Sequence, residues 1–322
     1  MAPGQPLDRL SPAPRHSLDL ALEGHVDESR DAPAPGSFRR VSVHSVLPPA
    51  LTSAVDEVLR APTVRHMAHG DADPVEACAA AASDESAMAV IGPYRSADVA
   101  EAVVATAPLG LPLLAPVATW AGVTRDDEPG CEDPARHRGT VLRMVARDTV
   151  VAGRIAATIR AAGQRAHVVA GEHEYGRQLD EQLSLGGLPR ADDGAEADVV
   201  VLAGLATGPE IGEVADLSPL PVIAFDGVQG ADLRTAGEIR LALPMAPQPA
   251  IGVDALLGGV ERARRAAELV VSALAAGARD RVALLRELRA QGGFDYHGDP
   301  VDPPVWLWRV RDDWEVEPDR AI

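Results

Sequence analysis

Two residue types are missing from this sequence: its 322 residues include no lysine and no asparagine. All 30 basic residues are therefore arginine. The lack of lysine excludes a Walker-type phosphate loop, a Schiff base and a lysine general base, because each needs an amine side chain. A GC-rich coding bias is the simplest explanation of the absence itself.

Cysteine is almost absent too, with only Cys78 and Cys131. Two cysteines make neither a disulfide framework nor a metal site. Cys78 lies in an alanine-rich stretch, which favours a small buried residue over a bonded one, whereas Cys131 lies in a Pro/Gly/Asp loop where exposure is expected. Whether the two pair stays open. Aromatic residues are 3% of the chain, so Val, Leu and Ala must fill the core.

Positive charge is scarce relative to negative charge, and the formal net charge is -18. This excludes a nucleic-acid partner and binding to an anionic membrane surface, since both need clustered cations. A small anionic ligand is not excluded, because one helix start outweighs distant charges within a screening length. With 46% apolar and 24% charged residues, the chain can bury a sizeable core.

The first 35 residues lack the basic start, apolar core and cleavage site of an export signal. As written, the chain is expected to be cytoplasmic, and extracytoplasmic only if translation begins upstream. Residues 1–39 are predicted to be disordered or irregular. The longest uncharged run, Ala102–Thr124, contains Pro108, Pro112 and Pro116, so it predicts a helix end, a loop and a buried strand, and no membrane span.

From about residue 40 onward, short apolar runs alternate with stretches rich in Ala, Leu, Glu and Arg. Continuous apolar runs are typical of strands covered by helices on both faces of a sheet. The predicted strands are Val41–Val46, Val64–His69, Met88–Ile91, Pro112–Ala115, Val141–Val145, Ala166–Ala170, Asp198–Ala203, Pro221–Phe225 and Arg240–Leu243, followed by a terminal hairpin of Val305–Val310 and Trp314–Val316. The alternation predicts an α/β protein with doubly wound parallel sheets.

Helix starts are marked at three places. Asp73, Pro74 and Glu76 form a capping pattern before an alanine run. Ser96 and Asp148 each begin a further helical stretch. The longest helices, Gly259–Ala276 and Asp280–Ala290, come late in the chain.

Three loops that follow predicted strands carry polar groups suited to a ligand, because ligands of open α/β sheets bind beyond the carboxyl ends of the strands. Ser96 offers a hydroxyl to a carboxylate, or is only a helix cap. Thr119 offers a hydroxyl and Val117 a carbonyl, or this is an ordinary strand exit with Trp120 packed over it. Asp226 offers a carboxylate to an ammonium group, or forms only an Asp-Gly turn. Together they match the two charged ends of an amino acid.

The sequence offers little to catalysis or metal binding. His173-Glu174-Tyr175-Gly176 lacks the second histidine of a zinc protease, and neither a GxGxxG loop nor a G-x-S-x-G elbow is present. His66, His69 and His137 show no metal-ligand grouping. No enzyme activity, no catalytic residue, no cofactor and no metal site are therefore predicted.

The order of the motifs resembles the type I periplasmic binding proteins, in particular the leucine/isoleucine/valine-binding branch of ABC transporter substrate-binding proteins. The resemblance covers about Arg40 to Val316. Its residues are His69-Gly70-Asp71-Ala72-Asp73-Pro74, Val90-Ile91-Gly92-Pro93-Tyr94-Arg95-Ser96, Leu114-Ala115-Pro116-Val117-Ala118-Thr119, Leu142-Arg143-Met144 followed by Asp148, Glu174-Tyr175-Gly176, Phe225-Asp226-Gly227-Val228, and Phe294-Asp295 followed by Gly298-Asp299. The segment before His69 is short for the family, Leu205 or its neighbours replace an expected aromatic residue, and Pro247–Gly258 is abbreviated.

The resemblance implies two lobes that close over an amino acid like a Venus flytrap. Ser96 and Thr119 would meet the ligand carboxylate, with the Ala118 backbone helping. The Val117 carbonyl and Asp226 would meet the amine, where the family usually has Glu, and Tyr175 would line the second lobe.

Lobe one is expected to comprise residues 40–120 and 247–291, and lobe two residues 121–246 and 292–322. The predicted function is capture of a small zwitterionic or carboxylate ligand by hinge closure, with an ABC permease as partner if the chain is exported. The alternative is a degenerate binding-protein fold that acts as a cytoplasmic sensor or a protein-interaction module.

Overall fold

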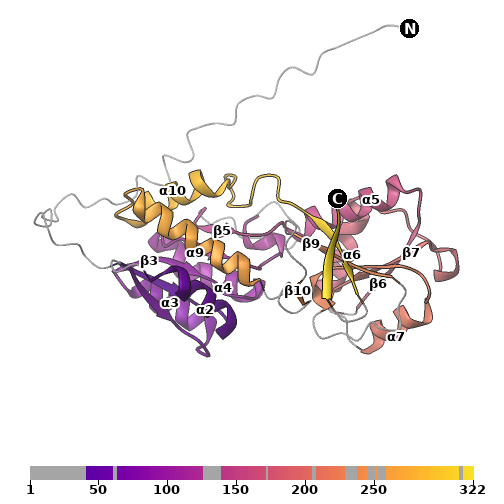
Figure 1. Cartoon of the computed structure of the whole chain (residues 1–322), viewed down its shortest axis with the longest axis horizontal. Coiled ribbons are helices and arrows are strands. Elements are labelled where there is room, and N and C mark those ends of the chain that lie inside the picture. Colours follow the sequence, from indigo (N-terminus) through magenta and orange to yellow (C-terminus); the bar gives the residue numbers. More distant parts are fainter. Residues whose placement is uncertain are drawn as a thin grey trace, which may run out of the picture. The chain divides into compact units, whose positions relative to one another are not determined.

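The computed structural model describes residues 41–60, 64–125, 139–171, 173–204, 208–228, 238–244, 251–252, 259–311 and 315–322. The predicted N-terminal segment, Cys131 and Leu205 lie outside these residues. Two separate sheets with covering helices make up the described part (Figure 1). No helix among the described residues has the length and apolar character needed to cross a membrane.

The first sheet has five parallel strands in the order β2-β1-β3-β4-β5. Its helices are early and late in the sequence, and we call this sheet with its helices the first lobe. The strands are β1 (Val41–Ser45), β2 (Val64–Ala68), β3 (Ala87–Ile91), β4 (Leu113–Ala115) and β5 (Val141–Arg143), and the helices are α2 (Pro49–Val58), α3 (Pro74–Ser83), α4 (Ser96–Thr106), α9 (Val260–Ala275) and α10 (Arg281–Gly292), with the 3-10 turns η1 (Ala107–Leu109) and η2 (Ala121–Val123).

The second sheet is mixed, in the order β10-β12-β11-β9-β8-β7-β6, and with its helices it forms the second lobe. Strands β6 to β9 are parallel, whereas β9, β11, β12 and β10 pair antiparallel in turn. The strands are β6 (Ala166–Ala170), β7 (Val199–Ala203), β8 (Val222–Ala224), β9 (Ile239–Leu243), β10 (Ile251–Gly252), β11 (Trp306–Val310) and β12 (Glu315–Ala321), and the helices are α5 (Asp148–Ala161), α6 (Glu174–Leu185) and α7 (Gly208–Asp216), with the 3-10 turns η3 (Gly194–Glu196) and η4 (Asp226–Val228).

Both faces of each sheet are covered, which explains the continuous apolar runs. Along β7, Val199 and Val201 pack into the cluster that α5 and α6 cover, whereas Val200 and Leu202 pack into the cluster that contains Val214 of α7. Adjacent strand residues point to opposite faces, so a strand covered on both sides needs an apolar residue at every position. The predicted doubly wound α/β class and the terminal hairpin are confirmed.

The helix starts agree with the sequence pattern. The Asp73 carboxylate accepts hydrogen bonds from the backbone N–H groups of Val75 and Glu76 and so caps α3. Helices α4 and α5 begin at Ser96 and Asp148, as predicted. Cys78 is fully buried in α3, and burial raises the pKa of its thiol to about 12.

The chain passes between the two sheets after β5, between β10 and α9, and between α10 and β11. The expected division started lobe two at residue 121, but β5 pairs with β4 in the first sheet. Likewise β10, expected in lobe one, pairs with β12 in the second sheet. Short strands beside a crossing can extend either sheet, and the sequence pattern alone does not choose.

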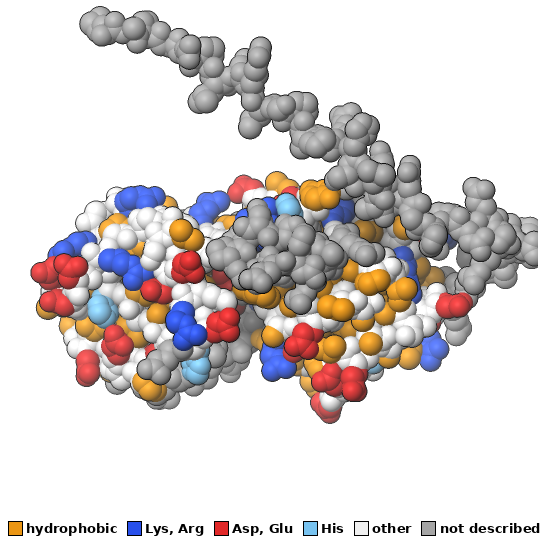
Figure 2. Space-filling model, turned by 180° about the vertical axis from the view of Figure 1, so that it is seen from behind, with side chains coloured by type: hydrophobic (Ala, Val, Ile, Leu, Met, Phe, Trp, Pro, Cys, Tyr) orange, Lys and Arg blue, Asp and Glu red, His pale blue; other side chains and the backbone are white. Residues whose placement is uncertain are grey.

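Charged side chains of both signs are interspersed on the described surface (Figure 2). Hydrophobic side chains gather over one face of the first lobe, on the right of that view.

Candidate functional site

Two neighbouring strand ends of the first lobe bring Ser96 and the loop after β4 together. Strands β3 and β4 are parallel neighbours, so their carboxyl ends meet at one edge of the sheet. The backbone N–H of Trp120 donates to the Ser96 hydroxyl over 3.3 Å. Helix α4 is preceded by Arg95 at the cap position, and no side chain there bonds the helix start. Ser96 is therefore not a simple helix cap, and its hydroxyl touches the Thr119–Trp120 loop.

Thr119 connects this loop to the second lobe. It is buried, with 8% of its surface exposed. Its backbone carbonyl accepts from the Asp148 N–H over 2.9 Å, at the start of α5. The Thr119 side chain acts on the Asp148 and Tyr175 side chains, since it lowers the pKa of each against the larger effect of burial. The strand exit therefore places Thr119 against the second lobe.

Tyr175, from the first turn of α6, lies between two carboxylates. Its hydroxyl donates to Asp226 Oδ1 over 3.1 Å and lies 3.4 Å from Asp148 Oδ1. Asp226 is at the carboxyl end of β8 and Asp148 at the start of α5, so three elements of the second lobe converge here. The structure thus joins Thr119, Tyr175 and Asp226 in one cluster and adds Asp148.

The cluster is electrostatically unusual because two carboxyl groups share a buried environment. Burial, and secondarily the charge of Asp226, raise the pKa of Asp148 to about 7. Burial also raises the pKa of Asp226, against the opposing effects of the Tyr175 hydroxyl and of Arg262. Loss of solvent raises the pKa of Tyr175 well above its ordinary value. Such displaced pKa values are typical of functional sites.

Val117 and Ala118 lie at the first-lobe side of the cluster. The Ala118 carbonyl accepts from Arg143 Nη1 over 2.7 Å. The Val117 side chain packs against Gly259 at the start of α9, where a Cβ would come within 2.1 Å of it. Arg262, one turn further along α9, interacts electrostatically with Asp226. The predicted residues are thus brought together from both lobes, and their roles toward a ligand stay predictions.

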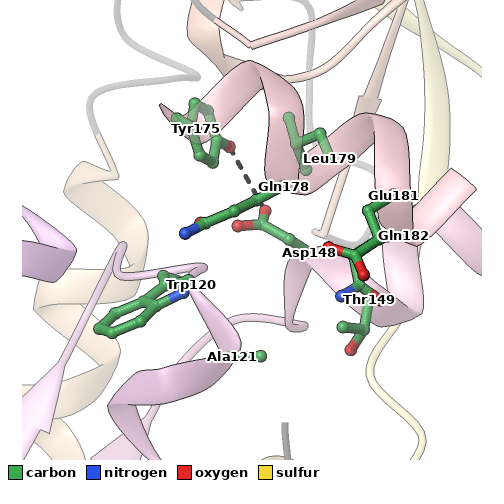
Figure 3. Close-up of a pocket in the computed structure, with 9 residues that line it drawn as sticks. All are labelled: Trp120, Ala121, Asp148, Thr149, Tyr175, Gln178, Leu179, Glu181 and Gln182. Carbon is green, nitrogen blue, oxygen red and sulfur yellow. Dashed lines mark hydrogen bonds between the residues drawn. The ribbon is translucent and has the colours of Figure 1, made fainter. Parts of the chain in front are cut away.

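A small cavity of about 30 Å³ lies beside the cluster (Figure 3). Trp120 lies across from the residues of α6, and Asp148 lies between them. The lining residues are Trp120, Ala121, Asp148, Thr149, Tyr175, Gln178, Leu179, Glu181 and Gln182.

A larger cavity, about 300 Å³, lies elsewhere in the described chain. Arg125, Arg147, Asp299 and Asp302 are among its lining residues. Asp299 accepts from Arg143 Nε over 3.0 Å and from Arg125 Nε over 3.1 Å. This cavity borders the ion pairs at a lobe crossing, and no predicted site residue lines it.

Two residues of the cluster, Asp148 and Arg262, are not among the predicted site residues. Asp148 carries a signal, since it is an acidic residue at a helix start, but that pattern alone predicts only a local role at the start of the helix. The structure turns its side chain into the cluster, with 5% of the residue exposed. Arg262 had no signal, because nothing in a helical stretch rich in arginine marks the one that faces a site.

His44, His66 and His69 make hydrogen bonds within the first lobe. His66 pairs with Ser45 and Asp56, and His69 pairs with His44. Within the described residues, no three His, Cys, Asp or Glu side chains form a group that could hold a metal.

No protein-family model matches the sequence, and no curated protein sequence does. Solved structures are similar to the chain as a whole. Two structures of an ABC transporter substrate-binding protein from Desulfitobacterium hafniense, one complexed with Leu, are 17% and 18% identical to it, with TM-scores of 0.68 and 0.66, covering 87% and 88% of this chain and 99% of each neighbour.

A leucine-binding protein, LivK, from Thermotoga maritima is 18% identical with a TM-score of 0.63, over 88% of this chain and 98% of that one. A solute-binding protein of an ABC transporter from R. palustris, in complex with benzoate, is 16% identical with a TM-score of 0.59, over 88% of this chain and 98% of that one. These similarities confirm the predicted fold: the chain has the two-lobed α/β fold of type I periplasmic binding proteins.

Proposed function

We propose that this chain is a solute-binding protein that captures a small zwitterionic or carboxylate ligand between its two lobes by hinge closure. The observation that carries the proposal is the meeting of Thr119 with Tyr175, Asp148 and Asp226. Polar groups from both lobes converge at strand ends and helix starts, where α/β folds bind their ligands.

Each end of a zwitterion has a matching group in this arrangement. The Ser96 and Thr119 hydroxyls and the Ala118 backbone serve the carboxylate. The Asp226 carboxylate and the Val117 carbonyl serve the amine, and Tyr175 closes the site from the second lobe. The ligand would enter while the lobes are apart and would be held when they close.

The solved neighbours support a ligand with a carboxylate. Leucine and benzoate, which two of them hold, share that group and differ in the amine. We assign this chain no catalytic step, because capture and release need only the opening and closing of the lobes. If the chain is exported, an ABC permease would receive the ligand.

Titration calorimetry with a panel of amino acids and aromatic carboxylates tests the function. We expect at least one ligand to bind, and Ser96→Ala and Asp226→Ala each to weaken it about 10- to 100-fold, the range for a lost hydrogen bond to a charged group. Ser83→Ala, at an exposed serine of α3, and Asp302→Asn, which lines the larger cavity, are matched controls.

A folded protein that binds no member of the panel would contradict the proposal. It would favour the degenerate fold that uses its surface for interactions. If Asp302→Asn weakens binding while Asp226→Ala does not, the ligand sits in the larger cavity and the assignment of site residues is wrong.

A further inference from the structure

The cavity beside the proposed site is lined by acidic and amide side chains as well as by the apolar side chains of Trp120, Ala121 and Leu179. Two carboxylates, Asp148 and Glu181, and two amides, Gln178 and Gln182, face it with the Trp120 ring. None of its nine lining residues is basic. A neutral side chain entering the cavity would find apolar contact with Trp120, Ala121 and Leu179, but it would leave the buried Asp148 carboxylate without a compensating charge.

Among these groups, Asp148 has the greatest need of a compensating charge. Its carboxyl is buried and shares the Tyr175 hydroxyl with Asp226. One hydroxyl proton serves only one of the two carboxylates at a time. A buried carboxylate is stable when a cation or a proton accompanies it.

Two arginines interact electrostatically with the Asp148 and Asp226 carboxyls, and each also has another role. Arg143 is fully buried and its Nε donates to Asp299 over 3.0 Å. Arg262 acts on Asp226 from α9. When both carboxyls are ionised and a ligand amine has taken Asp226, Asp148 therefore still favours a positive group on its cavity side.

Trp120 supplies a second feature suited to a cation. Its indole borders the cavity on the side facing α6 (Figure 3). Tryptophan attracts ammonium and guanidinium groups more strongly than other aromatic side chains, and most strongly where water is excluded. The net charge of -18 also raises the local concentration of cations around the whole chain.

We propose that the ligand is a basic amino acid, with an ammonium or guanidinium group on its side chain that enters the enclosure between Asp148, Trp120 and Glu181. This inference rests on the proposed function, since the α-carboxylate and α-amine occupy the groups assigned there. It differs from the leucine and benzoate of the solved neighbours in requiring a second positive charge.

A proton should leave the site when such a ligand binds. Burial and the neighbouring Asp226 raise the pKa of Asp148 to about 7, so near pH 6 most of this carboxyl is protonated in the empty protein. A ligand cation favours the ionised form. The charged or titratable groups that face it are Asp226, Tyr175, Arg143 and, across the cavity, Glu181. Affinity for a basic ligand should therefore rise between pH 5.5 and pH 8.

Pairs of ligands matched in shape isolate the side-chain charge. The comparison is arginine against citrulline and lysine against norleucine, by titration calorimetry of the full chain at pH 8. We expect each charged ligand to bind about 10- to 100-fold more tightly than its neutral counterpart. Repeating the titration at pH 6 in two buffers of different ionisation enthalpy should reveal proton release for arginine.

Asp148→Asn and Trp120→Leu test the two walls of the enclosure. Each should reduce the preference for arginine over citrulline, whereas Asp216→Asn, at an exposed position of α7, should leave it unchanged. Circular dichroism of each variant checks that it folds, and the wild-type ligand pairs decide the matter even if one variant does not.

The possible results distinguish a failure of the basic-ligand proposal from a failure of the proposed solute capture. If leucine or citrulline binds as tightly as arginine, the ligand class is wrong and solute capture stands. If arginine binds without proton release at pH 6 and Asp148→Asn keeps the preference, Asp148 does not hold the cation. If no amino acid binds to folded protein, both proposals fail.

Discussion

The Tyr175 hydroxyl stands between two carboxyl groups that a single proton cannot satisfy together. It lies 3.1 Å from Asp226 Oδ1 and 3.4 Å from Asp148 Oδ1. Because desolvation raises the pKa of both carboxyls, the folded chain without ligand retains a proton that the unfolded chain loses. The same buried carboxyl that favours a cationic ligand thus costs stability at neutral pH.

This cost predicts how Asp148→Asn changes stability with pH. The pKa of Asp148 rises from 3.8 to about 7 on folding, so between these values the folded state binds more protons than the unfolded state. The contribution of Asp148 to the free energy of unfolding of the wild type therefore falls as pH rises through this window. Asparagine cannot ionise. The free energy of unfolding of the variant should therefore rise relative to that of the wild type between pH 5 and pH 8, by on the order of 1 kcal/mol or more.

Urea unfolding of both proteins at pH 5 and pH 8, without ligand, measures this difference. Using the difference between variant and wild type removes the contributions of other titrating groups. Asp216→Asn, at an exposed carboxylate, should show no such pH dependence. An Asp148→Asn effect equal at both pH values would mean that this carboxyl is already ionised in the folded protein at pH 5.

At the scale of elements, the start of α6 approaches the end of β7 so closely that no side chain fits between them. Gly204 has φ of +104°, and a Cβ on it would lie 2.7 Å from the Gly176 Cα. The contact is with backbone, which cannot give way as a flexible side chain can. This approach sets the position of α6 and hence of Tyr175, its second residue.

Gly204→Ala should therefore destabilise the chain by about 2 kcal/mol or more, from positive φ and from the backbone contact together. Gly212→Ala, in the exposed middle of α7 with open space around its Cβ, is the matched control and should stabilise by about 0.5–1 kcal/mol. Urea unfolding measures both. Equal effects of the two substitutions would show that α6 shifts to accommodate the methyl group.

The elements themselves were largely predictable, and the reason is local. Apolar runs such as Val199–Ala203 and the capping pattern at Asp73 depend on neighbours in sequence, so strands and helix starts follow from the residues. The sheet that receives a short strand depends on pairing at a distance. This is why β5 and β10 lie in sheets other than the expected ones.

The candidate site likewise has one part that the local sequence predicts and one part that depends on contacts between distant segments. Ser96 and Thr119 follow the ends of β3 and β4, and parallel pairing of these strands brings the two ends together without further information. Asp226 follows β8 of the other sheet, so strand pairing does not predict its approach to Thr119. The direction of the Asp148 side chain depends on Tyr175 and Thr119 arriving from other elements, and Arg262 reaches Asp226 from a late helix. No local pattern encodes these contacts.

At the scale of the whole molecule, one buried ion pair joins segments that cross between the lobes. Arg143, the last residue of β5, has no exposed surface, and Asp299 is 4% exposed in the segment between α10 and β11. Arg143 also donates to the Ala118 and Ala121 carbonyls and to the Thr124 hydroxyl. The pair thus ties two of the three crossings to the loop that carries Thr119.

Breaking this pair should destabilise the entire described fold. Arg143→Met leaves the Asp299 carboxylate buried without its main partner, and Asp299→Asn leaves the guanidinium likewise, so each should cost about 3–5 kcal/mol. The double variant should cost clearly less than the sum of the two, since neither charge then remains. Urea unfolding of the four proteins forms the cycle.

The pH dependence of this pair follows from Asp299, whose pKa is lowered chiefly by Arg143 despite its burial. The excess in free energy of unfolding of the wild type over Asp299→Asn should therefore persist at neutral pH and shrink as pH falls below 3.8 toward the folded pKa. If the destabilisations of the two single variants add up to that of the double variant, Arg143 and Asp299 act independently. Another interaction would then have to hold the crossing segments together.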